Sequence, residues 1–421
     1  MGVSLKSFQE VIRGAKYLER HRKSEADFTR NRKLPFVSLL KFVLLKSVKS
    51  LQLRLSEFSD LLDEQMSASA LSQARKKLCH TAFIELLEKC VVDVMYGDGD
   101  YKQWNGRRLL AIDGSTLRVP KSEETLEAYG HSERDNQQLV EGKLSVIYDM
   151  LNRIPLNASL HRGRTNDIVA CQEQLSLLEK EDVVVADRGY DSYAFFAAIV
   201  ERGADFVVRC TACRTVCREL IANRKLREQV VTIPAPESRK ELPNELTLRF
   251  LRIPLPDGEV EILVTSLRDK KRFPYKALKK LYAKRWRIET YFQTLKGRLG
   301  LDNFSGKTKE AILQDLHACI FVSGLVTIFS EDANDELSNK TTTKFKQQVN
   351  NAVAFHAFKT KIVELIFDPP PDFAQQVSTL LVQNPTLVRP NRTKERVFEP
   401  RSASGKKRSL FYQKHLRKHV Y

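Results

Sequence analysis

Apolar residues in the first part of the chain recur about every 3.6 residues, the spacing of a helix. This spacing predicts helical structure in LPFVSLLKFVLLKSVKSLQLRLSEF (34–58). SASALSQARKKL (67–78) predicts another helix, which begins at serine caps. In some proteins a short helix, a turn and a basic helix form a helix-turn-helix that binds DNA. In others the same elements only pack together as part of a helical bundle. We expect residues 1–95 to be a helical, DNA-binding region, and bundle packing alone is the alternative.

The pattern changes in residues 96–208, where short apolar runs alternate with helical segments. LLAID runs as an apolar strand into Asp113, and DVVVAD is a buried strand that ends at Asp187. The rest of this region predicts a hairpin, a helix, a second helix and a strand, in the order 143–160, 165–180, 193–203 and 204–210. The result is a mixed α/β domain with both aspartates at strand ends, where the sites of α/β proteins usually lie.

Three short strands with charged loops between them predict a β-rich insertion at residues 209–262. The core resumes at residues 263–330, so that residues 96–208 and 263–330 are its two parts. The segment AILQDLHACIFVSGLVTIFS (311–330) carries Asp315 and His317, which predicts a buried helix rather than a membrane span.

The C-terminal region, residues 331–421, is predicted to be helical and basic. A helix over 341–367 is expected to end at the proline run 368–372. The tail 387–421 interleaves Lys and Arg with aromatic residues, a pattern that favours nucleic-acid contact over a solvated tail. The aromatic residues of this tail are Phe398, Phe411, Tyr412 and Tyr421.

The segment YAKRWRIETYFQTLKGRLG (282–300) lies in a very basic part of the chain, with Glu289 as its one acid. We predict a single helix from about Lys276 to Gly297 or Gly300, where glycine suits a helix end. At about 100° per residue, four residues share one face of that helix: Tyr282, Arg285, Glu289 and Lys296. The alternative is a solvated basic helix in which Glu289 only pairs with Arg285.

The net charge of the 421-residue chain is +18, and this excess points to a polyanion partner such as DNA. The N-terminus lacks the apolar core of a signal peptide, so we expect a cytoplasmic, nucleoid-associated protein of a bacterium.

Seven cysteines in such a chain predict reduced thiols. One spacing among Cys210, Cys213 and Cys217 resembles that of a zinc site, but a fourth ligand is lacking, so we expect free thiols there.

Asp113, Asp187 and Glu289 are expected at one edge of one sheet. Each alone has an ordinary role: a turn before glycine, a salt bridge or a helix pair. Together, in a protein that binds a polyanion, three carboxylates suit two Mg²⁺ or Mn²⁺ ions of the kind that catalyse phosphoryl transfer. The surrounding cations would bind phosphates.

The spacing Tyr282-x2-Arg285-x3-Glu289-x6-Lys296 matches the Y-R-E-K signature of the insertion sequence 4 family of DDE transposases. IDGSTLRVP resembles the region of that family's first catalytic aspartate, and VVADRGYDS resembles the second. The resemblance covers about residues 60–325, including SASALSQARKKL.

The resemblance implies a ribonuclease H-like core with an inserted β-rich subdomain. It implies cut-and-paste transposition by a homodimer on two transposon ends, through nicking, a hairpin intermediate and strand transfer. Asp113, Asp187 and Glu289 would be catalytic and hold the metal ions. Tyr282, Arg285 and Lys296 would contact double-stranded DNA, at the inverted-repeat ends or in the target. Arg188 and Lys143 are further candidates for DNA contact, on charge alone.

Family members stack an aromatic side chain on a flipped base. Here the two tryptophans, Trp104 and Trp286, lie outside the insertion. The candidates are therefore Phe250, Phe273 and Tyr275, and the alternative is that this chain does not share base stacking with the family. Two alternatives to a transposase stay open at this point. One is another ribonuclease H-like endonuclease or recombinase, and the other is a catalytically silent DNA-binding derivative.

Overall fold

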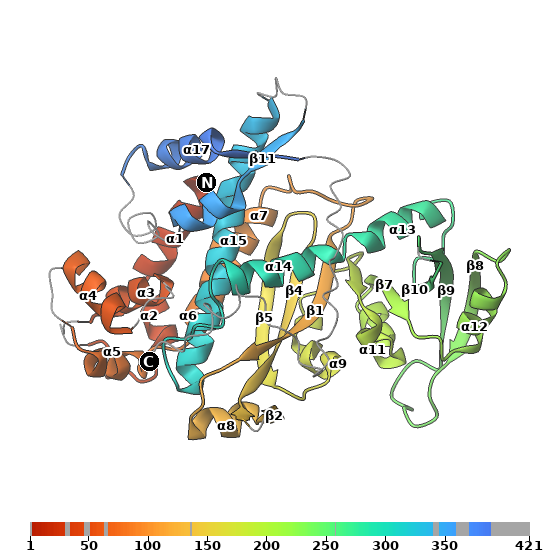
Figure 1. The fold of residues 1–421 in the computed structure, drawn as a ribbon, viewed down its shortest axis with the longest axis horizontal. Coiled ribbons are helices and arrows are strands. Elements are labelled where there is room, and N and C mark those ends of the chain that lie inside the picture. Colours follow the sequence, from red (N-terminus) through yellow and green to blue (C-terminus); the bar gives the residue numbers. More distant parts are fainter. Residues whose placement is uncertain are drawn as a thin grey trace, which may run out of the picture. The chain divides into compact units, whose positions relative to one another are not determined.

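A computed structural model describes residues 2–29, 34–45, 51–62, 66–134, 137–256, 258–339, 345–358 and 370–388. The chain forms two compact units (Figure 1). The first comprises Met1–Gly97, Arg118–Ala128 and Gln293–Tyr421, and the second comprises Asp98–Leu117 and Tyr129–Phe292. The five regions expected from the sequence have different boundaries, because residues 118–128 and 293–330 of the predicted core fall in the first unit. The predicted basic tail lies outside the described residues from position 389 onward.

The second unit is built on an eight-stranded sheet with the order β5-β4-β1-β6-β7-β10-β9-β8 (Figure 1). Its strands are β1 (Leu109–Arg118), β4 (Glu141–Asp149), β5 (Ile154–Arg162), β6 (Val183–Ala186), β7 (Asp205–Cys210), β8 (Glu228–Pro234), β9 (Glu245–Pro254) and β10 (Val260–Thr265). Strands β4 and β5 form the predicted hairpin, while β6 runs parallel to both β1 and β7. All four residues of β6 are buried, as its continuous apolar sequence indicates.

Strands β8, β9 and β10 occupy the segment predicted as an insertion. They continue the main sheet, because β10 pairs antiparallel with β7, with Val264 opposite Val208. The insertion therefore shares its backbone hydrogen bonds with the core and does not form a sheet of its own.

The register of β1 and β6 determines where the two aspartates lie. Ala111 is paired with Val185, so Asp113 and Asp187 each lie two residues beyond the same paired position. The prediction that Asp113 ends its strand was wrong, since β1 continues to Arg118. The part of β1 that continues past the end of β6 lies beside β4, its other neighbour in the sheet.

The helices of this unit are short. They are α9 (Asp167–Ala170), α10 (Gln172–Leu175), η2 (Arg188–Tyr190), α11 (Tyr193–Glu201), α12 (Thr215–Ala222) and α13 (Tyr275–Ala283). The helix predicted over 165–180 is divided at Cys171, and it is capped by Asn166, whose side chain accepts from the Ile168 amide at 2.9 Å. Helix α8 (Glu123–Tyr129) belongs to the first unit except for its last residue. It is followed in the sequence by the small hairpin of β2 (Ser132–Arg134) and β3 (Gln137–Leu139) in the second unit.

The single helix predicted from Lys276 to Gly297 was wrong. It is divided into α13 and α14 (Trp286–Gly297) by a turn at Lys284 and Arg285. The amide of Arg285 bonds the carbonyl of Tyr282, three residues back, and the amide of Ile288 bonds the carbonyl of Arg285. These bonds are tighter than the four-residue spacing of an α-helix, so the regular 100° per residue used to predict a common face is interrupted between Tyr282 and Trp286.

The first unit is helical. Its helices are α1 (Gly2–Arg13), α2 (Ala15–His21), α3 (Phe36–Leu44), α4 (Leu51–Leu62), α5 (Ala68–Arg75), α6 (Thr81–Leu87), η1 (Glu88–Val92), α7 (Asp93–Tyr96), α15 (Lys309–Asn339) and α17 (Phe373–Gln383). Helix α15 packs against α3, α6 and α17. By length and composition α15 could cross a membrane, but 94% of its most apolar window is buried inside the protein. The prediction of a buried helix over 311–330 is confirmed.

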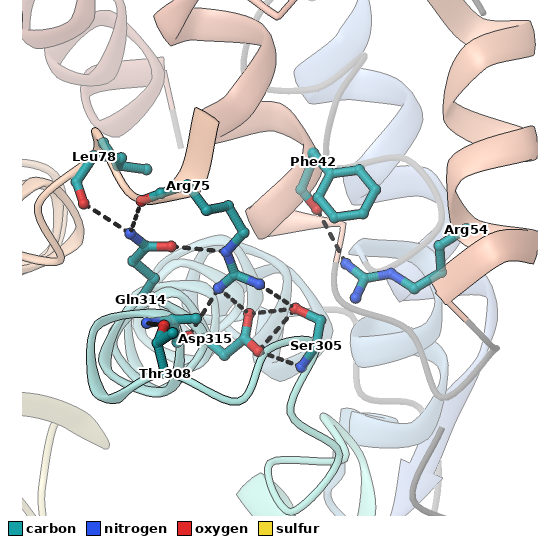
Figure 2. Close-up of polar contacts among 9 residues, drawn as sticks. Phe42, Arg54, Arg75, Leu78, Ser305, Thr308, Gln314 and Asp315 are labelled. Carbon is teal, nitrogen blue, oxygen red and sulfur yellow. Dashed lines mark hydrogen bonds and ion pairs between the residues drawn. The ribbon is translucent and has the colours of Figure 1, made fainter. Parts of the chain in front are cut away.

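Arg75, the last residue of α5, links this helix to α15 through a network of buried hydrogen bonds (Figure 2). Its guanidinium donates to the Gln314 side chain at 2.8 Å and to Asp315 at 3.0 Å. It also donates to Ser305 and to the Ala311 carbonyl. At the other end of α5, the Ser67 side chain accepts from the Ala70 amide at 3.1 Å, which confirms the predicted serine cap.

The predicted C-terminal helix is only partly present. Residues 351–358 are helical, but Gln347–Val349 form a short strand β11, which pairs with β12 (Pro385–Leu387). The Asn334 side chain accepts from the Val349 amide at 2.7 Å and holds the end of β11. Pairing with a distant segment therefore overrides the local helical pattern there.

Candidate active site

Asp113 and Asp187 are each oriented by a neighbouring glycine amide in the second unit. Oδ1 of Asp113 accepts from the Gly114 amide at 2.8 Å. Oδ1 of Asp187 accepts from the Gly189 amide at the same distance and begins the short helix η2. The paired register of β1 and β6 and these two bonds fix the direction of both carboxylates.

Glu289 lies in the first turn of α14 and is held by Arg285 from the turn before that helix. The guanidinium donates to Glu289 Oε1 at 2.6 Å, and its other terminal nitrogen is 3.8 Å from Asp113 Oδ2. Arg285 is thus a cation between two of the three predicted catalytic carboxylates. Its buried Nε has no hydrogen-bond partner among the described residues, so its polar contacts are incomplete.

The pKa of Asp113 is raised to about 6, mainly because the carboxyl group is buried. The nearby charges of Asp187 and Glu289 contribute to the same rise. The Gly114 amide and the Arg285 cation act in the opposite direction. The ionised form of Asp113 therefore lacks sufficient positive charge around it.

The donor chemistry of this group fits a divalent metal ion. Carboxylate oxygens are the preferred ligands of Mg²⁺ and Mn²⁺, and a cation, the Arg285 guanidinium, already contacts two of the carboxylates. Within the described residues, no three Asp, Glu, His or Cys side chains are close enough together to hold a metal as they stand. Asp113, Asp187 and Glu289 therefore have suitable donor oxygens, but their spacing as it stands is wider than that of a formed metal site.

The other predicted contact residues have differing surroundings. Tyr282 lies on α13, and burial raises its pKa to about 12. Arg188 is exposed, and its guanidinium has no partner in the part of the chain that the structure describes. Lys296 lies on α14, two turns after Glu289 but in the first unit, and burial lowers its pKa.

Lys143 lies on β4 and is not a free cation. Its ammonium is 2.6 Å from Oδ1 of Asp167, and only 18% of its side chain is exposed. Asp167 is the first residue of α9, and Asn166 caps that helix. No local pattern showed that Asp167 would meet a residue of β4.

The structure also corrects the candidates for base stacking. Phe250 is fully buried, and Phe273 is 4% exposed and stacked on Trp104. The Tyr275 hydroxyl donates to the Arg252 carbonyl. The two phenylalanine rings cannot reach a base in this structure, because they belong to the core. Trp286 is 49% exposed.

The three cysteines near β7 are free thiols, as expected. Cys210 and Cys217 are buried and Cys213 is exposed. The carboxylate beside them, Asp191, is bound by Thr211 and Arg214. These contacts satisfy Asp191 within the protein.

Comparisons with known proteins agree with the sequence signature. The family described as Transposase DDE domain matches residues 104–325, which is more than half of the chain. Transposase InsG for insertion sequence element IS4, from Escherichia coli (strain K12), is 25% identical over 269 residues, 62% of this chain and 60% of that protein. The Sinorhizobium fredii protein y4zB is 26% identical over 196 residues, 44% of this chain and 52% of its own.

The chain thus spans between about half and 60% of the length of these relatives. A solved structure titled as the piggyBac transposase synaptic complex with hairpin DNA is 11% identical, with a TM-score of 0.45. That likeness covers 89% of this chain and 83% of the other. The identification made from the Y-R-E-K signature and the two aspartate regions is confirmed by the family match. The chain belongs to the transposase DDE domain family.

Proposed function

We propose that this protein is a DNA transposase that cuts an insertion sequence out at its ends and joins the released 3′ ends to a target. One observation carries the proposal: the family match spans the segment in which Arg285 contacts Asp113 and Glu289, and in which the charge of Asp187 acts on Asp113. The signature residues and the carboxylate group thus support the same function.

The three carboxylates would hold divalent ions, Mg²⁺ or Mn²⁺, two in number by resemblance to the family. When bound, such ions supply charge stabilisation and nucleophile activation for phosphoryl transfer. Asp113 and Asp187 provide oxygens in orientations fixed by Gly114 and Gly189. Glu289 provides the third carboxylate from α14, once Arg285 releases it.

Arg285 has two roles in this proposal. Without metal, it neutralises part of the charge on Asp113 and Glu289. With metal, its guanidinium is free to grip a DNA phosphate, for which its forked geometry is suited. Tyr282, Lys296 and Arg188 would be further DNA contacts, and the hairpin intermediate stays a prediction from the family.

The partners follow from the same proposal. The net charge of +18 supports binding of double-stranded DNA at inverted-repeat ends and in the target. A homodimer on two ends, cytoplasmic and associated with the nucleoid of a bacterium, is the expected assembly. The core would be ribonuclease H-like, and the hairpin β4–β5 beside β1, with parallel β6 and β7 beyond, supports that fold.

Cleavage of end DNA tests the proposal. A plasmid that carries the element's ends, incubated with Mg²⁺, should be nicked by the parent protein. Asp113→Asn, Asp187→Asn and Glu289→Gln should abolish nicking and keep end binding. Glu241→Gln, which changes an exposed ion pair with Arg239, is the control and should cut normally.

Two outcomes would contradict the proposal. Mg²⁺-dependent nicking by Glu289→Gln would remove Glu289 from the site. Cleavage of any DNA with no preference for a pair of inverted repeats would favour a different endonuclease on the same core.

A further inference from the structure

Asp167 and Lys143 form an ion pair directly beside the first catalytic aspartate. A methyl group on Gly114 would lie 2.5 Å from Oδ1 of Asp167 and 2.9 Å from Cε of Lys143. The pair is therefore packed against the residue that follows Asp113, and only a glycine leaves room for it there.

Asp167 also lies beside the second catalytic aspartate. A methyl group on Gly189 would lie 3.0 Å from Oδ1 of Asp187 and 3.7 Å from Oδ2 of Asp167. The two carboxylates thus approach the same point from different elements, since Asp167 begins α9 and Asp187 follows β6. Three carboxylates, from β1, α9 and the end of β6, share this corner of the second unit.

An unsatisfied hydroxyl accompanies these carboxylates. The Tyr190 side chain is 1% exposed, and its Oη has no hydrogen-bond partner among the described residues. Burial raises the pKa of Tyr190, and the charges of Cys171, Asp167, Asp113 and Asp187 raise it further. A buried hydroxyl without a partner is unfavourable, so a further polar group or ligand beside these carboxylates would satisfy it.

We propose that Asp167 is a fourth carboxylate of the metal site, and that Lys143 is its counter-ion while the metal is absent. This inference rests on the proposed function and adds a residue that the signature does not contain. Lys143 then has a role different from DNA contact. It offsets a negative charge that would otherwise repel Asp113 and Asp187.

A purely structural role makes different predictions. If the pair only anchors α9 to β4, loss of either charge lowers stability and leaves metal affinity unchanged. If Asp167 serves the metal, the two losses have opposite effects. Removing the carboxylate weakens metal binding, and removing the ammonium strengthens it by freeing the carboxylate.

Mn²⁺ binding to the full-length protein without DNA, followed by the electron paramagnetic resonance of free Mn²⁺, tests this. Asp167→Asn should weaken Mn²⁺ binding by about 10-fold or more. Lys143→Met should tighten it, on the order of 10-fold, because the Asp167 carboxylate is freed and a nearby positive charge is removed. In the double variant the gain from Lys143→Met should be clearly smaller, because the freed carboxylate is absent and only the change in charge remains.

Asp205→Asn is the matched control. Asp205 pairs with Arg107 at 2.8 Å and lies at the start of β7, at the opposite ends of the parallel strands. It should leave Mn²⁺ affinity unchanged. Asp167→Ser is a second charge-removing variant should Asp167→Asn fail to fold, as judged by circular dichroism.

The outcomes separate the two proposals. If Asp113→Asn loses Mn²⁺ binding while Asp167→Asn and Asp167→Ser bind like the parent, Asp167 is not part of the site. If Lys143→Met binds like the parent, the counter-ion role is overturned. If Asp113→Asn itself binds Mn²⁺ normally, the proposed metal site is wrong.

Discussion

Two arginine–carboxylate clusters, one around Arg75 in the first unit and one around Arg285 in the second, differ in how completely their polar groups are hydrogen-bonded. Arg75 in the first unit is 5% exposed, its partner Asp315 is fully buried, and serine, glutamine and carbonyl groups complete the network (Figure 2). Arg285 in the second unit contacts Asp113 and Glu289, of which Glu289 is 32% exposed. One arginine there meets two carboxylates, with a third carboxylate, Asp187, nearby.

This difference in hydrogen bonding separates a cluster with a structural role from one that is able to bind a ligand. A buried ion pair that is fully hydrogen-bonded has no capacity left for a ligand. A group with excess negative charge, a raised pKa at Asp113 and an unpaired guanidinium nitrogen can still bind cations and phosphates. By this criterion we expect the Arg75 network to be structural, and the Arg285 group is the proposed site.

The largest expected effect is in the Arg75 network. Arg75→Met leaves Asp315 buried without its cation, which should lower the free energy of unfolding by about 3–5 kcal/mol. Urea denaturation measures this. Lys76→Met, the exposed neighbour, is the control and should change stability by less than about 0.5 kcal/mol. A small loss in Arg75→Met would contradict the structural role.

At Asp113 we expect the opposite effect, a substitution that raises the free energy of unfolding. Folding raises the pKa of Asp113 from 3.8 to about 6, so the ionised carboxylate destabilises the folded state at pH 7. Asp113→Asn should therefore raise the free energy of unfolding at pH 7 by about 1–3 kcal/mol. The folded parent binds its proton more tightly between pH 4 and 6, so its stability falls as pH rises through that window.

Denaturation at several pH values checks this sign. The advantage of Asp113→Asn over the parent should be largest above pH 6 and should vanish near pH 4. A variant that is less stable than the parent at pH 7 would show that Asp113 is a satisfied structural carboxylate, like Asp315.

A smaller effect is expected for DNA binding. Arg285→Ala should weaken binding to pre-cleaved end DNA by about 1–3 kcal/mol, since a charged hydrogen bond to phosphate is lost. Lys296→Ala should have an effect of the same kind. Each should reduce the salt dependence of binding by about one counterion. Titration at several salt concentrations measures both quantities, and Glu289→Gln should leave both unchanged. Binding equal to the parent at every salt concentration would exclude these contacts.

The sequence predicted the parts of this picture that depend on local pattern. The apolar runs gave the hairpin, β6, α11 and the buried part of α15, and Ser67 marked the start of α5. The shared sheet edge of Asp113 and Asp187 follows from parallel strands, which a sequence of alternating strands and helices indicates.

Other parts depend on distant contacts. The turn at Lys284 and Arg285 has no proline or glycine to mark it, and it is found where Arg285 reaches Asp113. Asp167 meets Lys143 only because the loop after β5 returns to β4. Strand β11 replaces a helical pattern because β12, some forty residues later, pairs with it.

Thermal unfolding with and without Mn²⁺ tests the central claim most directly. A ligand at about 100 times its dissociation constant stabilises a folded protein by about 2.7 kcal/mol, which raises the melting temperature. Mn²⁺ should therefore raise the melting temperature of the parent and of Lys76→Met, and should leave Asp113→Asn and Glu289→Gln unchanged. An equal rise in all four proteins would contradict the account, because the carboxylates around Arg285 would then not be the metal site.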